Sequence, residues 1–210
     1  VYQITHLDTG DKVDISSIEI SNTGVDISLS PGGRILVSTG AGIAYEPLSF
    51  IDTQTRVEVA VAAPFLDHTS AEFCDDGTLL LTTTYGHSFA MPFDNAMYDA
   101  RLSASGELIL GGNRLTSGAQ PNNGSCAPGS RAGVLLDRDS GLTSFTLPGL
   151  KQADFASLHG ATAVSAAFNR HGDRLYIRTT ETVEAFDFNP LNGMMQADWV
   201  QAVPYSSEYF

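Results

Sequence analysis

The sequence predicts an all-β fold, a β-propeller of about five blades or a segment of a larger propeller. The first observation is a repeated pair of a hydrophobic residue and an aspartate, found at Asp8, Asp52, Asp94, Asp137 and Asp187. Successive aspartates lie 42 to 50 residues apart, close to the length of one four-stranded blade. The second observation is that no segment of ten or more residues shows the 3.6-residue apolar period of an amphipathic helix.

A glycine that closes a polar turn is the third observation. It occurs at Gly33, Gly77, Gly106 and Gly172, and an apolar, β-rich stretch follows each of them. Glycine at the last position of a tight turn supplies the positive φ that such turns often need. We therefore expect these glycines to join the first and second strands of each blade. The hydrophobic–Asp pairs then end the third strands, because an aspartate side chain accepts hydrogen bonds from backbone N–H groups two residues on.

In chain order, these landmarks give a half blade, four nearly whole blades and a last strand. Residues 1–20 supply the half blade and residues 203–210 the last strand, so a single domain over residues 1–210 is incomplete at both ends. Only 12 residues separate Asp94 from Gly106, and that blade is expected to have lost most of its fourth strand.

Segment 111–131 interrupts the even spacing of the landmarks. It is rich in Gly, Asn, Ser and Pro, and it is predicted to be a long loop between the second and third strands of its blade. Long loops in compact domains are often functional or disordered.

Incomplete blades predict an association. An open blade edge exposes unpaired backbone groups and invites pairing. We therefore expect the missing strands to come from a protein partner, a second copy of the chain, or the remainder of a longer chain. A β-sandwich or a solenoid other than a propeller is the alternative fold.

Two stretches resemble the YVTN-type propeller repeat of surface-layer and lactonase-like proteins. They are Ser30–Ser38 (SPGGRILVS) and Ser49–Val57 (SFIDTQTRV), and the similarity is clearest over residues 25–61 and 165–193. The chain departs from the pattern at residues 37–40, which read VSTG. The resemblance implies an extracytoplasmic propeller, secreted, periplasmic or on the cell surface. Proteins of this kind are often binding scaffolds and sometimes enzymes, and the repeat motif itself brings no catalytic residue with it.

Charge and hydropathy exclude several partners. The formal net charge of −13 argues against nucleic acid, because phosphate binding needs clustered Lys and Arg. It also argues against adhesion to an anionic membrane surface. No apolar run approaches the ~20 residues of a membrane span.

One face of the predicted propeller collects candidate ligand residues. Residues entering the first strands, and those between second and third strands, share a face, which we call the top face. The candidates there are His68, His87, His159, Asp26, Asp99, Tyr45 and Tyr85. Imidazoles and carboxylates that converge can bind a divalent cation or act as acid and base. The alternative is that each is an ordinary loop or strand-end residue with a local hydrogen bond.

Two further features carry weaker predictions. Asp137 and Asp139 alternate before a glycine as in calcium loops, but a plain turn explains them better because the distal Glu is absent. Cys74 falls in a turn on one face and Cys126 in the loop predicted on the opposite face, roughly 17 Å away across a five-residue strand. A Cys74–Cys126 disulfide requires the loop to fold over a blade edge, and the alternative is a bond to a cysteine of another segment.

The sequence therefore favours a non-catalytic, extracytoplasmic binding or structural module that belongs to a larger chain or assembly. The alternative is an enzyme, either a lactonase-like hydrolase or a subunit of a periplasmic oxidoreductase, that uses the top-face histidines and carboxylates.

Overall fold

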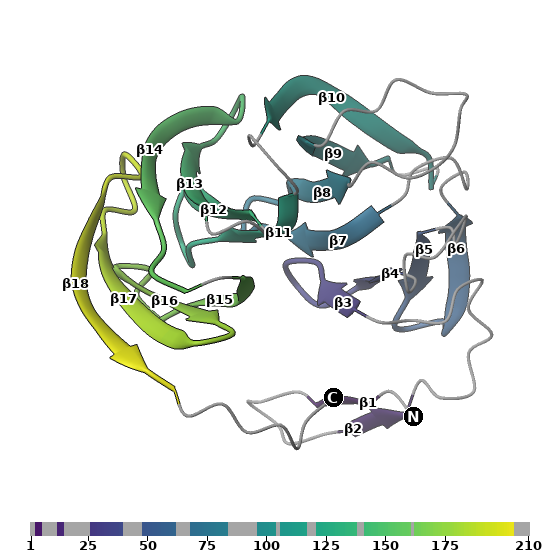
Figure 1. Cartoon of the computed structure of the whole chain (residues 1–210). Helices are drawn as coiled ribbons and strands as arrows, with labels where there is room; N and C mark the ends of the chain where they lie inside the picture. Colours follow the sequence, from purple (N-terminus) through teal and green to yellow (C-terminus); the bar gives the residue numbers. More distant parts are fainter. Residues whose placement is uncertain are drawn as a thin grey trace, which may run out of the picture.

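The computed structural model describes residues 3–5, 12–14, 26–39, 48–61, 68–83, 96–103, 106–116, 121–137, 141–160 and 162–203. All the regular structure in them is β-strand, and four antiparallel four-stranded sheets form the body of the molecule. Each sheet consists of four consecutive strands, and each is one blade of a β-propeller (Figure 1). The predicted all-β propeller fold is therefore confirmed.

The four blades follow one another in sequence. The first contains β3 (Asp26–Leu29), β4 (Ile35–Thr39), β5 (Ser49–Asp52) and β6 (Val57–Val61). The second contains β7 (His68–Phe73), β8 (Leu79–Thr83), β9 (Ala96–Leu102) and β10 (Leu108–Thr116). The third contains β11 (Pro121–Cys126), β12 (Ala132–Asp137), β13 (Gly141–Thr146) and β14 (Lys151–Ser157). The fourth contains β15 (Ala163–Phe168), β16 (Arg174–Thr179), β17 (Thr182–Phe188) and β18 (Met195–Ala202).

The first strand of each blade lies toward the middle of the ring. Strand β7 contacts β3 on one side and β11 on the other, and β11 also contacts β15. The strands then run outward in chain order, so β6, β10, β14 and β18 are the outer strands (Figure 1). This order is the usual one in propeller blades, because hairpins join sequential neighbours.

Blades pack face to face. We call the side of a blade that points toward the next blade in chain order its forward face, and the opposite side its backward face; the corresponding sides of the first and fourth blades keep the same names. Three apolar clusters fill the interfaces, centred on Phe50 and Leu81, on Phe145 and Leu80, and on Leu136 and Ile177. The strand period of two sends alternate residues to opposite faces. The second strands β4, β8 and β12 are therefore buried on both sides, which explains their nearly continuous runs of Leu, Ile and Val.

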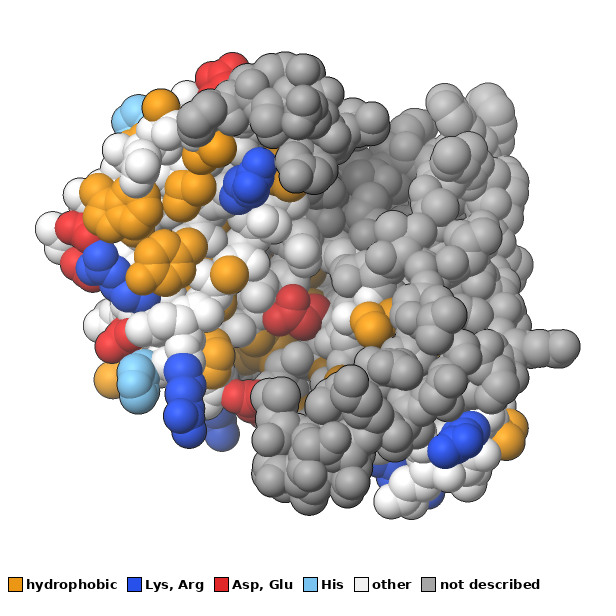
Figure 2. All heavy atoms as spheres, turned by 90° about the horizontal axis from the view of Figure 1, so that it is seen from below, with side chains coloured by type: hydrophobic (Ala, Val, Ile, Leu, Met, Phe, Trp, Pro, Cys, Tyr) orange, Lys and Arg blue, Asp and Glu red, His pale blue; other side chains and the backbone are white. Residues whose placement is uncertain are grey.

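One position on the forward face recurs in every blade. Ser28, Glu72, Ser125 and Ala167 each lie on the first strand and pair with a second-strand residue: Val37, Leu80, Val134 and Tyr176. Val37, Leu80 and Val134 are at most 1% exposed because the next blade covers them. Tyr176 is 37% exposed, and hydrophobic side chains gather on the surface of the β15–β18 blade, at the left of Figure 2.

The predicted phase of the repeat is right in three blades. Gly33, Gly77 and Gly172 close the turns between first and second strands, each donating its N–H to the carbonyl three residues earlier. Their φ angles of 74°, 85° and 70° lie in the left-handed region, as expected.

The predictions for Gly106 and for segment 111–131 are wrong. Gly106 joins the third and fourth strands, β9 and β10, and its blade keeps a fourth strand of nine residues. Segment 111–131 supplies the end of β10, all of β11 and the turn after it, rather than a long loop. Two of its glycines stand at close contacts: a Cβ on Gly111 would lie 2.2 Å from Asp99 Oδ1, and one on Gly124 2.4 Å from Met97 Sδ.

The chain ends are described only in part. Strands β1 (Gln3–Thr5) and β2 (Lys12–Asp14) pair as a separate two-stranded sheet. Val203 donates its backbone N–H to the carbonyl of Glu181, and residues 204–210 lie outside the described part of the chain. Asp8 and Asp94 also lie outside it. Among the described residues, none belongs to a helix long and apolar enough to cross a membrane.

Candidate functional site

The predicted top-face residues fall into three groups. Tyr45, Tyr85 and His87 lie outside the described residues. Asp26 and His68 begin β3 and β7, two of the inner strands. Asp99 and His159 have described side chains, and their contacts are given below.

Asp99 is not at the position that the alignment on Gly106 assigned to it. It lies in the third strand, β9, opposite Leu80. Its carboxylate accepts hydrogen bonds from the backbone N–H and the side-chain amide of Asn113, both at 3.3 Å. These contacts hold the bulge of the outer strand β10, so Asp99 contributes to the edge of its blade.

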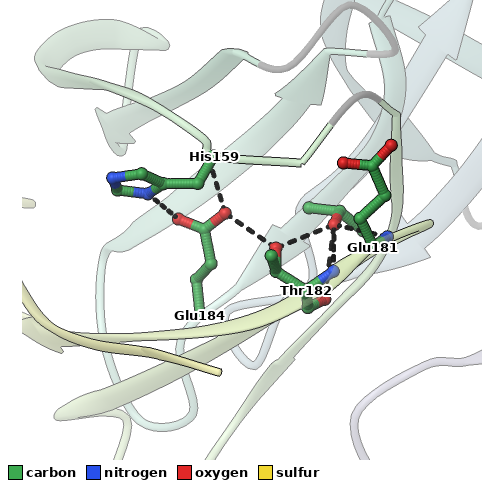
Figure 3. Close-up of polar contacts among 5 residues, drawn as sticks. His159, Glu181, Thr182 and Glu184 are labelled. Carbon is green, nitrogen blue, oxygen red and sulfur yellow. Dashed lines mark hydrogen bonds and ion pairs between the residues drawn. The ribbon is translucent and has the colours of Figure 1, made fainter. Parts of the chain in front are cut away.

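His159 lies beside a buried carboxylate. It follows β14, where the chain crosses from the third blade to the fourth, and its backbone N–H donates to Glu184 Oε1 at 2.7 Å. Its ring Nδ1 lies 3.1 Å from Glu184 Oε2 (Figure 3). The Glu184 side chain is 1% exposed, whereas that of His159 is 67% exposed. The ring is therefore accessible, while the carboxylate that orients it is not.

Hydroxyl groups complete this network. Thr182 donates its hydroxyl to Glu184 Oε1 at 3.0 Å, and the hydroxyl oxygens of Thr179 and Thr182 lie 2.8 Å apart. Thr179 Oγ1 also accepts the backbone N–H groups of Glu181 and Thr182 (Figure 3). A Cβ on Gly160 would lie 1.8 Å from Thr179 Oγ1, so only glycine fits there. The network ties the interblade crossing to the β16–β17 turn.

Glu184 was not predicted as a site residue, although the pattern of its strand could have indicated that its carboxylate is buried and hydrogen-bonded. Strand β17 places Thr182, Glu184, Phe186 and Phe188 on one face, and all four are buried. A carboxylate in a row of buried apolar side chains must have hydrogen-bond partners, because its burial is otherwise too costly.

Carboxylates also join the second blade to the third. Glu72 Oε1 accepts the hydroxyl of Ser125 at 3.1 Å and the backbone N–H of Cys126 at 3.2 Å. Asp75 Oδ2 accepts the N–H of Gly129 at 2.5 Å. These bonds run between adjacent inner strands and the turns that follow them.

A disulfide closes the same interface. Cys74 and Cys126 are bonded, with their Cα atoms 5.5 Å apart. The candidate disulfide is thus present, but the expected distance between the two cysteines was wrong. Cys74 directly follows β7 and Cys126 ends β11, so both lie at the same end of neighbouring inner strands.

The hydrophobic–Asp pair at Asp52 is structural. Asp52 accepts the backbone N–H groups of Gln54 and Thr55 at 2.9 and 3.0 Å, and Arg34 Nε lies 3.1 Å away. The hydrogen bond from Thr55, with those from Arg34 and Gln54, lowers the pKa of this carboxyl below its usual value, although desolvation acts in the opposite direction. Asp52 ends β5 and starts the turn to β6, as predicted.

The weak metal prediction finds no further ligands in the described part of the chain. Asp137 is buried at the end of β12, which is the second strand of its blade rather than the third, and Asp139 is outside the described residues. No three His, Cys, Asp or Glu side chains gather as metal ligands among the residues described.

Comparisons with known proteins agree on the fold. No protein-family model matches the sequence, and no curated protein does. A functionally unknown protein from Desulfotomaculum acetoxidans is similar in structure, with a TM-score of 0.73 and 16% identity over 87% of this chain and 57% of that one. The β-propeller domain of Cps50 (Swd1) from Myceliophteria thermophila has a TM-score of 0.68 and 11% identity, over 94% of this chain and 64% of that one.

Hydrazine synthase from Kuenenia stuttgartiensis is a third similar structure, with a TM-score of 0.66 and 10% identity over 93% of this chain and 58% of that one. This chain therefore spans less than two thirds of the length of each of the three. At such low identities the likeness shows the fold alone, and the resemblance to the YVTN-type repeat stays a prediction. The fold class is that of a β-propeller, represented here by four complete blades.

Proposed function

We propose that the chain is a non-catalytic β-propeller module that binds or supports other components of a larger assembly outside the cytoplasm. The observation that carries this proposal is the use of its buried and half-buried carboxylates. Glu72 and Glu184 accept hydrogen bonds across a blade interface or a blade crossing, and Asp52 holds a turn. Carboxylates engaged in this way rigidify a scaffold and are poorly placed to exchange protons with a substrate.

The disulfide supports a location outside the cytoplasm. Disulfides form and persist in secreted, periplasmic and cell-surface proteins, whereas thiols are kept reduced in the cytosol. The Cys74–Cys126 bond joins two blades, so it contributes to the part of the fold on which any binding surface depends.

One observation keeps the enzyme alternative open to test. The His159 ring is exposed and is oriented by Glu184, which is how a general base is often held. A lactonase-like hydrolase or a periplasmic oxidoreductase subunit that used this ring would need further groups from His68 and His87 and, for many such reactions, a divalent cation.

Metal analysis of the purified protein, combined with substitutions of histidine, separates the two functions. The binding-module proposal expects no stoichiometric Ca, Zn or Mn and no change in bound metal in His159→Ala or His68→Ala. Stoichiometric metal that is lost in either variant would overturn the proposal in favour of the enzyme. Asn169→Ala, in the turn after β15 and so at the opposite end of that strand from His159, is the matched control.

A further inference from the structure

The forward face of the fourth blade differs from the three forward faces that are covered. Tyr176 occupies the position of Val37, Leu80 and Val134, which the next blade buries. In the fourth blade the residue is aromatic, polar at its tip and 37% exposed. Val164, on the inner strand of the same blade, is 48% exposed. Tyr176 thus stands at a position that is buried between blades elsewhere, but here it is not packed against another blade in the described part of the chain.

An aromatic pair lies at the centre of this face. The rings of Tyr176 and Trp199 are 6.4 Å apart, tilted by 52°, and Trp199 is 40% exposed. Beside them Arg174 binds both Asp187 and Asp198, which fixes the guanidinium across three strands. Trp, Tyr and Arg are the residues most enriched among those that dominate binding at protein interfaces. The composition is therefore typical of a protein-binding surface.

A pocket continues the surface toward the turn between β17 and β18. Its volume is about 550 Å³, and Asp187 and Gln196 of the same sheet line it together with Leu191 and Met194. Leu191 is 89% exposed and Met194 49% exposed. An apolar side chain of a bound protein could insert into this pocket and contact the hydrophobic side chains that line it.

The first blade exposes the complementary kind of face. In the second blade, Ala71 and Phe73 of the inner strand pack backward onto the first blade, and Ala71 is 2% exposed. Their counterparts in the first blade, Ile27 and Leu29, are 40% and 39% exposed. Further out, Leu36 and Ile51 on this backward face are buried, so its uncovered part lies along β3.

We propose that the chain associates head to tail with a second copy of itself, the forward face around Tyr176 and Trp199 of one copy meeting the backward face around Ile27 and Leu29 of the next. Each of the three blade interfaces in the described part of the chain joins one forward face to one backward face, and the forward face around Tyr176 and the β3 part of the first blade's backward face are left partly exposed. A second copy brings the complement of both. Head-to-tail contacts close into rings where the rotation allows and otherwise extend as filaments. This inference rests on the proposed function and names its partner.

Trp199 makes the contact directly observable because it is the chain's single tryptophan. Sedimentation equilibrium and acrylamide quenching of Trp199 fluorescence are measured on the same dilution series of the full chain. We expect the average mass to rise above 22.3 kDa with concentration and the quenching of Trp199 to fall over the same range. A monomer at every concentration, with Trp199 equally quenched throughout, overturns the inference. That result leaves the proposed function standing, because the metal and histidine experiments test it separately.

Substitutions on the two faces test the head-to-tail geometry. Tyr176→Ala, which keeps the fluorescent reporter, and Leu29→Asp should each shift association to concentrations about tenfold higher or more. An equimolar mixture of the two variants retains one intact contact per pair and should form dimers where neither variant does alone. Ile109→Asp, at a residue 53% exposed on β10 and outside both faces, is the matched control and should associate as the unsubstituted chain does.

The remaining outcomes are also decisive. If the mixture fails to recover dimers while both variants keep the circular dichroism and melting temperature of the unsubstituted chain, the two faces do not meet. If Tyr176→Ala does not fold, Arg178→Glu changes an exposed residue of the same face without removing an aromatic contact. It should weaken association if the forward face is the interface, and leaving association unchanged counts against it.

Discussion

Glu72 Oε1 accepts a hydrogen bond from the backbone N–H of Cys126, across the interface between the second and third blades. The same joint exists one blade earlier, where the Ser28 hydroxyl oxygen accepts the N–H of Phe73 at 2.9 Å. Ser28 and Glu72 occupy the same position in the repeat, and so do Phe73 and Cys126. At these two joints a polar side chain two residues before the first turn therefore links neighbouring inner strands.

Removing the carboxylate of this joint should destabilise the protein. Glu72→Ala leaves the Ser125 hydroxyl and the Cys126 N–H without their acceptor, and each half-buried donor left unpaired costs about 1–3 kcal/mol. Urea unfolding should show a lower midpoint with an unchanged slope. Glu107→Ala, an exposed glutamate in the same blade, serves as control and should stay within about 0.5 kcal/mol. Equal effects of the two substitutions would show that the interblade bond contributes nothing.

The disulfide at this interface should contribute more than any single hydrogen bond. It closes a sequence separation of 52 residues, and a native bond of this kind typically stabilises by about 2–4 kcal/mol. The double variant Cys74→Ala, Cys126→Ala should lose that amount in urea unfolding, and dithiothreitol should destabilise the unsubstituted chain but not the double variant. Thiol titration of the denatured, unreduced protein should detect no free cysteine. Two free thiols in protein folded under oxidising conditions would contradict the assignment.

The sequence was sufficient for the fold class because the repeat reflects turn chemistry that every blade needs. Asp52 could be assigned its role directly, since its carboxylate caps the two N–H groups that follow it. The phase failed at Gly106 for the same chemical reason. Gly106 donates to the Ser103 carbonyl at 3.0 Å in a third-to-fourth turn, with the geometry that Gly77 has in a first-to-second turn.

The true first turn of the third blade lacked the expected signal. There Ser130 closes the turn on the Ala127 carbonyl, and glycine stands one position earlier, at Gly129. The shifted phase placed Cys126 on the wrong face and assigned the end of β10 and all of β11 to a loop. The network around Glu184 was not predicted because its partners lie on different strands and on the connection between the third and fourth blades. No spacing of residues along the sequence indicates such a network.

The His159–Glu184 pair gives a prediction that separates the contribution of the His159 backbone N–H from that of its ring. Glu184→Ala should destabilise the fold by several kcal/mol, because it leaves the backbone N–H of His159 without its acceptor and takes from the buried Thr182 hydroxyl one of its two partners, the other being Thr179. His159→Ala keeps the backbone donor and removes only an exposed ring, so a loss of about 1 kcal/mol or less is expected. Thermal unfolding of both variants at one pH makes the comparison. A larger loss in His159→Ala would show that the ring, rather than the backbone, holds the carboxylate.

Acid stability should depend on Asp52. Its pKa is lowered in the folded protein by the backbone N–H of Thr55, and also by Arg34 and Gln54, so the folded state favours the ionised carboxylate. The stabilisation is therefore complete above the usual pKa of 3.8 and disappears as the pH falls through the lower folded value. Asp52→Asn removes this dependence, so its free energy of unfolding should fall less steeply than that of the unsubstituted chain as the pH falls through and below 3.8. Urea unfolding at a series of pH values measures both slopes, and Glu107→Gln, at an exposed glutamate just after Gly106, is the control. Parallel slopes for Asp52→Asn and the unsubstituted chain would show that this carboxyl has the same pKa folded and unfolded.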